Sequence, residues 1–152
     1  MLSNIDTKVI SFFRKIYLPF SRFSLFVVFF WFGILKVLGL SSASGVVERL
    51  FEQTIPFMSF GLFFILFGLF ECLIGILFLV KGFERIVIPL LFVHMITTLG
   101  PLFLLPEETW VKFLVPTLEG QYIIKNLVIV AVAIGIAAHL EPASPGNNSQ
   151  VK

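Results

Sequence analysis

Four long apolar runs dominate the sequence, and they cover about residues 22–40, 57–80, 86–105 and 121–140. A helix of about 20 apolar residues spans the roughly 30 Å hydrocarbon core of a bilayer and satisfies its own backbone hydrogen bonds there. Charged residues make up only 13% of the chain, whereas about 25% is usual for soluble domains. The sequence therefore predicts an all-α integral membrane protein built as a four-helix bundle.

The segment before the first run has a helical pattern of its own. Apolar residues recur at helical spacing from Ile5 to Phe20, and Lys8 and Lys15 fall on the other side. This pattern predicts a short N-terminal helix in the cytoplasmic membrane interface, with Pro19 at the bend into the membrane. A disordered basic tail is the alternative interpretation. The first run is about full spanning length and lacks a clear small-x-small cleavage site, so we expect a retained helix rather than a signal peptide.

These patterns divide the chain into an N-terminal interfacial segment (1–20), a domain of four transmembrane helices (21–140) and a tail (141–152). The tail has the polar composition of a disordered cytoplasmic end. Most basic residues outside the apolar runs fall on the side of the N-terminus, whereas Arg49 and Lys112 fall on the other. Because cytoplasmic loops carry the excess of Lys and Arg, we expect both termini to be cytoplasmic.

The cysteine and histidine content excludes several kinds of site. The chain has one cysteine, Cys72, so it cannot form an intramolecular disulfide, a CxxC redox pair or a cysteine metal cage. His94 and His139 lie at different predicted depths, and Glu71 with His94 offers only two ligands, so we expect no metal or haem site. Nothing in the sequence indicates nucleic-acid binding.

Two polar side chains lie deep in the predicted bilayer. Glu71 falls about nine residues before the cytoplasmic end of its run, and His94 falls about nine residues after the cytoplasmic start of its own. A rise of about 1.5 Å per residue places both roughly 13 Å deep, so we expect them to meet. Thr97 and Thr98 follow His94 at i+3 and i+4, which predicts one polar stripe on that helix. A carboxyl group at this depth requires a partner, whereas His94 alone also fits a hydrogen-bonded core histidine.

Two lysines lie nearer the opposite boundary. Lys36 and Lys125 each sit about four residues inside it, with Gln121 and Asn126 close to Lys125. We expect these residues to form an outer polar layer, set apart from the deeper carboxyl and imidazole groups. Glu119 or a ligand would balance the charge of Lys125, or Glu71 would do so if the fourth helix sits lower in the membrane. The alternative is that each lysine snorkels to the boundary.

Glycines in and just after the second run recur every seven residues, at Gly61, Gly68, Gly75 and Gly82. Small residues on one stripe let helices pack closely in a bilayer. Gly33 lies one turn before Lys36 on the same face and predicts a similar close approach beside that lysine.

Several segments resemble a known family. FWFGILKVLGL in the first run, FGLFECLIGILFL in the second, FVHMITTLGP in the third and EGQYIIKNLVIV in the fourth are similar to the DoxX-like group, which includes DoxD and YkgB relatives. The resemblance covers about residues 20–140 in order and implies a four-helix bundle in the bacterial inner membrane. Some members are associated with quinone-linked sulfur oxidation or with resistance to oxidants. The polar positions that the resemblance carries over are Lys36, Glu71, His94 and Lys125.

Two functions remain open from the sequence. In the first, the chain is a small subunit associated with quinone-linked redox or oxidant-stress chemistry and binds an apolar ligand, such as a quinone, between helices. Ligand carbonyls would accept from Lys125, Lys36 or His94, while Glu71 and His94 relay a proton. A partner redox subunit or the ligand must carry the electrons, so we expect no catalysis by the chain alone. In the second, the chain is a non-enzymatic scaffold or small transporter, alone or as a homo-oligomer, whose buried charges stabilise the bundle.

Overall fold

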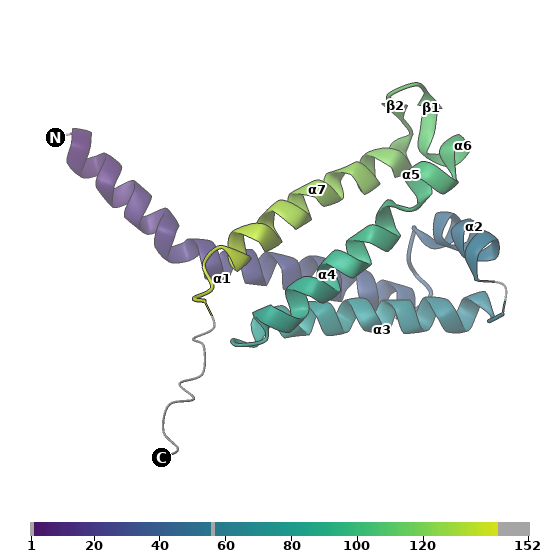
Figure 1. Cartoon of the computed structure of the whole chain (residues 1–152), viewed down its shortest axis with the longest axis horizontal. Helices are drawn as coiled ribbons and strands as arrows, with labels where there is room; N and C mark the ends of the chain where they lie inside the picture. The colour runs from purple at the N-terminus through teal and green to yellow at the C-terminus, as the bar shows by residue number, and fades with distance from the viewer. Residues whose placement is uncertain (1, 56, 143–152) are drawn as a thin grey trace, which may run out of the picture.

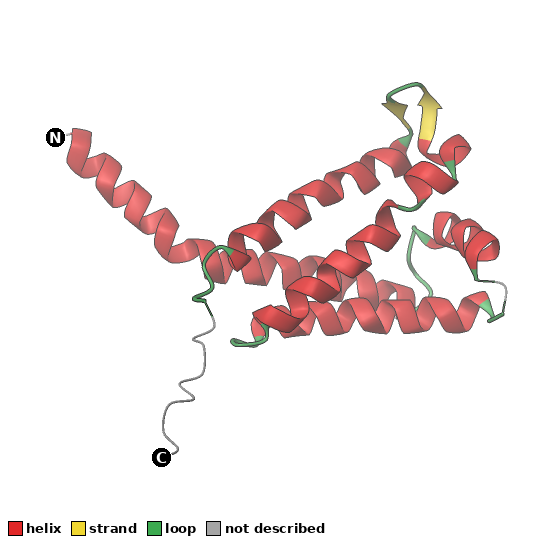
Figure 2. Cartoon of the chain, viewed as in Figure 1, coloured by secondary structure: helices red, strands yellow, loops and turns green. Residues whose placement is uncertain are grey.

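The computed structural model describes residues 2–55 and 57–142, and most of them are helical (Figure 2). In chain order, the elements are α1 (Leu2–Val37), α2 (Ser44–Thr54), α3 (Phe60–Leu79), α4 (Glu84–Leu99), α5 (Pro101–Leu104), α6 (Pro106–Thr109), β1 (Trp110–Lys112), β2 (Val115–Pro116) and α7 (Leu118–Ala137). The all-α prediction is confirmed, with one short antiparallel hairpin formed by β1 and β2. All but two residues of the predicted tail lie outside the described residues.

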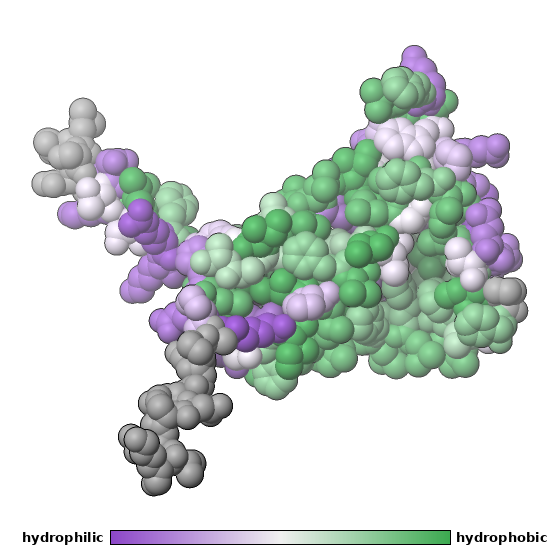
Figure 3. Space-filling view, viewed as in Figure 1, coloured by the Kyte–Doolittle hydropathy of each residue, from purple (hydrophilic) through white to green (hydrophobic). Residues whose placement is uncertain are grey.

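Four helical stretches are long and apolar enough to cross a membrane, as the sequence predicts. They are Ile5–Val37, Phe60–Leu79, Glu84–Leu104 and Leu118–Ala137. Large apolar side chains cover much of the outer surface of these helices (Figure 3). The stretches lie side by side as a helical bundle (Figure 1).

The N-terminal segment is helical as predicted, but it is not a separate element. Residues 2–37 form one continuous helix with Pro19 inside it. Proline removes one backbone hydrogen bond and commonly kinks a helix, and here the helix continues through it. Figure 1 shows that the N-terminal part of α1 projects from the bundle at an angle to the remainder. The predicted division at residue 20 therefore falls inside α1 and not between two elements.

Helices α1 and α3 pack against each other more extensively than any other pair. Their backbones approach at glycines, since a Cβ added to Gly33 would lie 2.6 Å from Gly68 O, and one added to Gly75 would lie 2.8 Å from Phe30 N. The close approach predicted at Gly33, Gly68 and Gly75 is confirmed. At Gly61 and Gly82 an added Cβ would meet nothing within 4 Å, so the stripe is a packing surface over only part of its length.

The apolar core lies in the half of the bundle where α3 ends and α4 begins. Each of the four long helices contributes fully or almost fully buried side chains, among them Leu25, Ile74, Phe78, Leu91 and Ile136. At the same end, Arg22 of α1 forms an ion pair with Glu84 at the start of α4. At the opposite end of the bundle lie α2, α5, α6 and the hairpin, where Arg49 of α2 pairs with Glu108 of α6. We call this the hairpin end.

Candidate functional site

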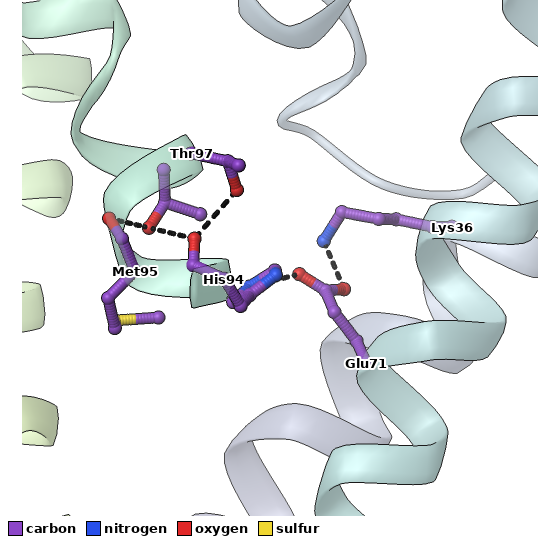
Figure 4. Close-up of polar contacts among 6 residues, drawn as sticks. Lys36, Glu71, His94, Met95 and Thr97 are labelled. Carbon is purple, nitrogen blue, oxygen red and sulfur yellow. Dashed lines mark hydrogen bonds and ion pairs between the residues drawn. The ribbon is translucent and has the colours of Figure 1, made fainter. Parts of the chain in front are cut away.

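Three charged or titratable side chains from three different helices meet inside the bundle. Lys36 Nζ of α1 donates to Glu71 Oε2 of α3 at 2.6 Å, and His94 Nε2 of α4 lies 3.2 Å from Glu71 Oε1 (Figure 4). The exposed fractions of these residues are 6%, 5% and 2%, respectively. The predicted meeting of Glu71 and His94 is therefore confirmed. We refer to Lys36, Glu71 and His94 as the buried triad.

The structure contradicts the prediction that Lys36 belongs to a layer apart from Glu71. The Cα–Cβ bond of a helical residue tilts toward the N-terminus of its helix. Lys36 lies in the last turn of α1, so its side chain leans back into the bundle rather than out of it. Gly68 gives the lysine stem room, because a Cβ there would lie 2.8 Å from the Cβ of Lys36. The ammonium thus reaches Glu71, about one turn deeper along α3.

The predicted outer polar layer around Lys125 is wrong, because the face of α7 that carries Lys125 is exposed and not packed inside the bundle. Lys125 lies in the second turn of α7 and is exposed, with its Nζ 4.7 Å from the centre of the Tyr122 ring. Glu119 and Gln121 are also exposed, and Asn126 is half-buried. Helix α7 starts at the hairpin end, so the side chain of Lys125 also leans toward that end and does not reach the triad. Among the described residues, neither Glu119 nor Glu71 forms an ion pair with Lys125.

Aromatic rings enclose the His94 imidazole. Its centroid lies 5.0 Å from that of Phe67, 5.5 Å from that of Phe29 and 6.0 Å from that of Phe70. Phe67 also lies 5.6 Å beneath the ammonium of Lys36. This aromatic wall is not among the features predicted from the sequence, although Phe67 and Phe70 lie four residues and one residue before the deep Glu71. A ring at i−4 on the same helix face is the signal that identifies Phe67.

One polar atom of the triad has no protein partner. A carboxylate oxygen only accepts, so Nε2 of His94 carries the proton that faces Glu71. Nδ1 of His94 is buried without a hydrogen-bond partner among the described residues. It is an acceptor in the neutral ring and a donor in the imidazolium. A buried polar atom without a hydrogen-bond partner destabilises the fold unless another group forms a hydrogen bond with it.

The predicted polar stripe of α4 does not extend the triad. The hydroxyl groups of Thr97 and Thr98 donate to the backbone carbonyl of His94, at 2.7 and 3.2 Å. Thr98 Oγ1 also lies 3.0 Å from the carbonyl oxygen of Met95. Helical threonines commonly bond backward in this way. Both hydroxyl groups therefore bond to the backbone of their own helix and not to the triad.

Two further observations bear on the kind of site. Within residues 2–55 and 57–142, no group of three or more His, Cys, Asp or Glu side chains is placed to hold a metal ion. The buried thiol of Cys72 lies 3.6 Å from the carbonyl oxygen of Phe30, across the contact of α1 and α3.

No protein-family model, curated protein or solved structure matches this chain. Its function is therefore inferred from the side chains themselves.

Proposed function

We propose that the chain is a multi-pass protein of the bacterial inner membrane, related to the DoxX-like group, with both termini in the cytoplasm. Four apolar helices of spanning length support the insertion. Apart from Lys36 and Lys125 within the spanning helices, the described basic residues support the orientation. Arg49 and Lys112 lie at the hairpin end, whereas six basic residues lie toward the end where α3 ends and α4 begins: Lys8, Arg14, Lys15, Arg22, Lys81 and Arg85. In this orientation the hairpin end faces outward.

The triad is the proposed binding site, and the unpartnered Nδ1 of His94 is the observation that carries this proposal. The missing partner is the polar end of an apolar ligand of the quinone class that enters between helices. A quinol hydroxyl would donate to Nδ1 of the neutral ring, whereas a quinone carbonyl would accept from Nδ1–H of the imidazolium. The same atom therefore suits both redox forms of one ligand.

The role of the chain in such chemistry is to bind the ligand and to hold one proton. Converting a quinone to a quinol takes two electrons and two protons, and a partner redox subunit would supply both electrons and the proton that the triad does not hold. Glu71 Oε1 lies 3.2 Å from Nε2 of His94, and Lys36 in turn compensates the Glu71 carboxylate. The triad would thus connect ligand binding to the protonation of one imidazole.

A ligand-binding test follows from the two nitrogen atoms of His94. In His94→Gln the side-chain amide still donates to Glu71 from near the position of Nε2, but it lacks the group at Nδ1. We expect this variant to fold and to bind a short-chain ubiquinone about tenfold more weakly than the unaltered chain, as measured by thermal-shift titration in detergent. Thr97→Val is the matched control on the same helix, and it should bind as before because the only described partner of the Thr97 hydroxyl is the backbone carbonyl of His94. Equal binding by His94→Gln and the unaltered chain would overturn the proposal.

A scaffold role is the second candidate, and the direct contact between Lys36 and Glu71 favours it. In this case the triad joins α1, α3 and α4, and His94 completes the link without a ligand. The scaffold role predicts that the purified chain retains no quinone detectable by mass spectrometry. His94→Gln would then change only the stability of the bundle.

A further inference from the structure

We infer that the face of α7 around Lys125 binds the phosphate group of an anionic phospholipid at the hairpin end of the bundle. This inference rests on the proposed insertion of the chain into a membrane. Gln121, Tyr122 and Lys125 lie within the first two turns of α7 and are all exposed. Their i, i+1 and i+4 spacing places them on one side of the helix. The ammonium of Lys125 and the ring of Tyr122 are already in contact, at 4.7 Å.

Lys125 needs a counter-charge that the described protein does not supply. It lies seven residues after the start of the spanning stretch Leu118–Ala137, so its Cα is about 10 Å along the helix. An ammonium inside a spanning segment costs at least a few kcal/mol unless it reaches a charged or hydrated partner. Glu119, six residues earlier, lies about 120° away around the helix axis. No described ion pair includes Lys125.

The position and chemistry of this face favour a lipid phosphate group. The side chain of Lys125 leans toward the start of α7, where headgroups lie when the helix spans a bilayer. The lysine ammonium, the tyrosine hydroxyl and the glutamine amide all donate hydrogen bonds, which matches the acceptor oxygens of a phosphodiester. The side chains of Leu118, Leu127 and Val128 on the same helix are each more than 60% exposed and can contact acyl chains. In the proposed orientation, this lipid belongs to the outer leaflet.

The test is a lipid titration of the purified full chain in detergent. Phosphatidylglycerol should raise the melting temperature and appear as a bound adduct in native mass spectrometry, whereas inorganic phosphate should do neither. Lys125→Gln should weaken the apparent affinity for phosphatidylglycerol about fivefold, the effect of roughly one basic residue near an anionic surface. Lys81→Gln is the control, because Lys81 is an exposed lysine at the other end of the bundle and should keep the original affinity.

Two results would overturn this lipid site. One is a titration in which Lys125→Gln responds as the unaltered chain does, and the other is an equal loss of affinity in Lys81→Gln. Alkaline extraction of membranes tests insertion separately. If the chain stays in the membrane after alkaline extraction and Lys125→Gln keeps its lipid affinity, only the lipid site is refuted. A chain that alkali releases refutes the proposed insertion.

Discussion

Lys36→Met is expected to lower the free energy of unfolding by about 3 kcal/mol, whereas Lys125→Met should change it by less than about 0.5 kcal/mol. Lys36 is 6% exposed and donates to Glu71, so its removal leaves a buried carboxylate with His94 alone. Lys125 is exposed and contacts only the Tyr122 ring among the described interactions. Methionine preserves most of the length of the stem and thereby isolates the loss of charge.

The measurement for this pair is unfolding by SDS in mixed micelles without added lipid, followed by circular dichroism. Each lysine serves as the control for the other, because both lie in spanning helices near the hairpin end. Equal losses of stability in the two variants would contradict the different environments that the structure gives them. A larger loss for Lys125→Met would favour the polar outer layer that the sequence predicts.

The second large effect is expected at the contact of α1 and α3. Gly68→Ala places a Cβ 2.7 Å from the carbonyl oxygen of Gly33 and 2.8 Å from the Cβ of Lys36. The carbonyl belongs to a helical backbone and cannot rotate away, so the two helices must separate locally. We expect a loss of about 2 kcal/mol in the same unfolding measurement, in the range of overpacked cores. Thermal unfolding should show the same order of stability.

Gly61→Ala is the matched control, since it lies on the same heptad stripe but an added Cβ meets nothing within 4 Å. Its stability should be unchanged or slightly raised, because alanine favours a helix more than glycine does. Equal losses of stability in Gly61→Ala and Gly68→Ala would contradict a close approach of α1 and α3 at Gly68.

Much of the fold could be predicted from the sequence, because helix length and depth scale directly with residue number. Four apolar runs predict four spanning helices, and a rise of about 1.5 Å per residue brings Glu71 level with His94. The same calculation failed for Lys36, since sequence position gives the depth of Cα but not of an ammonium at the end of a long side chain. The direction of the helix decides whether that side chain leans inward or outward.

Other features of the site depend on which helices are neighbours. Helix α7 is apolar on nearly every side, so its sequence does not indicate which face packs against α4 and α1 and which remains exposed. The sequence therefore predicts for Lys125 an inward polar pocket that the bundle does not form. Likewise, the pairing of Arg22 with Glu84 depends on α1 passing beside the start of α4. The sequence places opposite charges at one membrane boundary, which permits the ion pair of Arg22 and Glu84 but does not predict it.

The triad is the central feature of the molecule, and a double-mutant cycle of Lys36→Met and Glu71→Leu tests it most directly. Each single change leaves a charged or polar partner buried without its counterpart, whereas the double change removes both members of the ion pair. In SDS unfolding, we expect the double variant to be more stable than the sum of the single losses predicts, by about 2 kcal/mol. Losses that add to within about 0.5 kcal/mol would contradict a direct contact between Lys36 and Glu71.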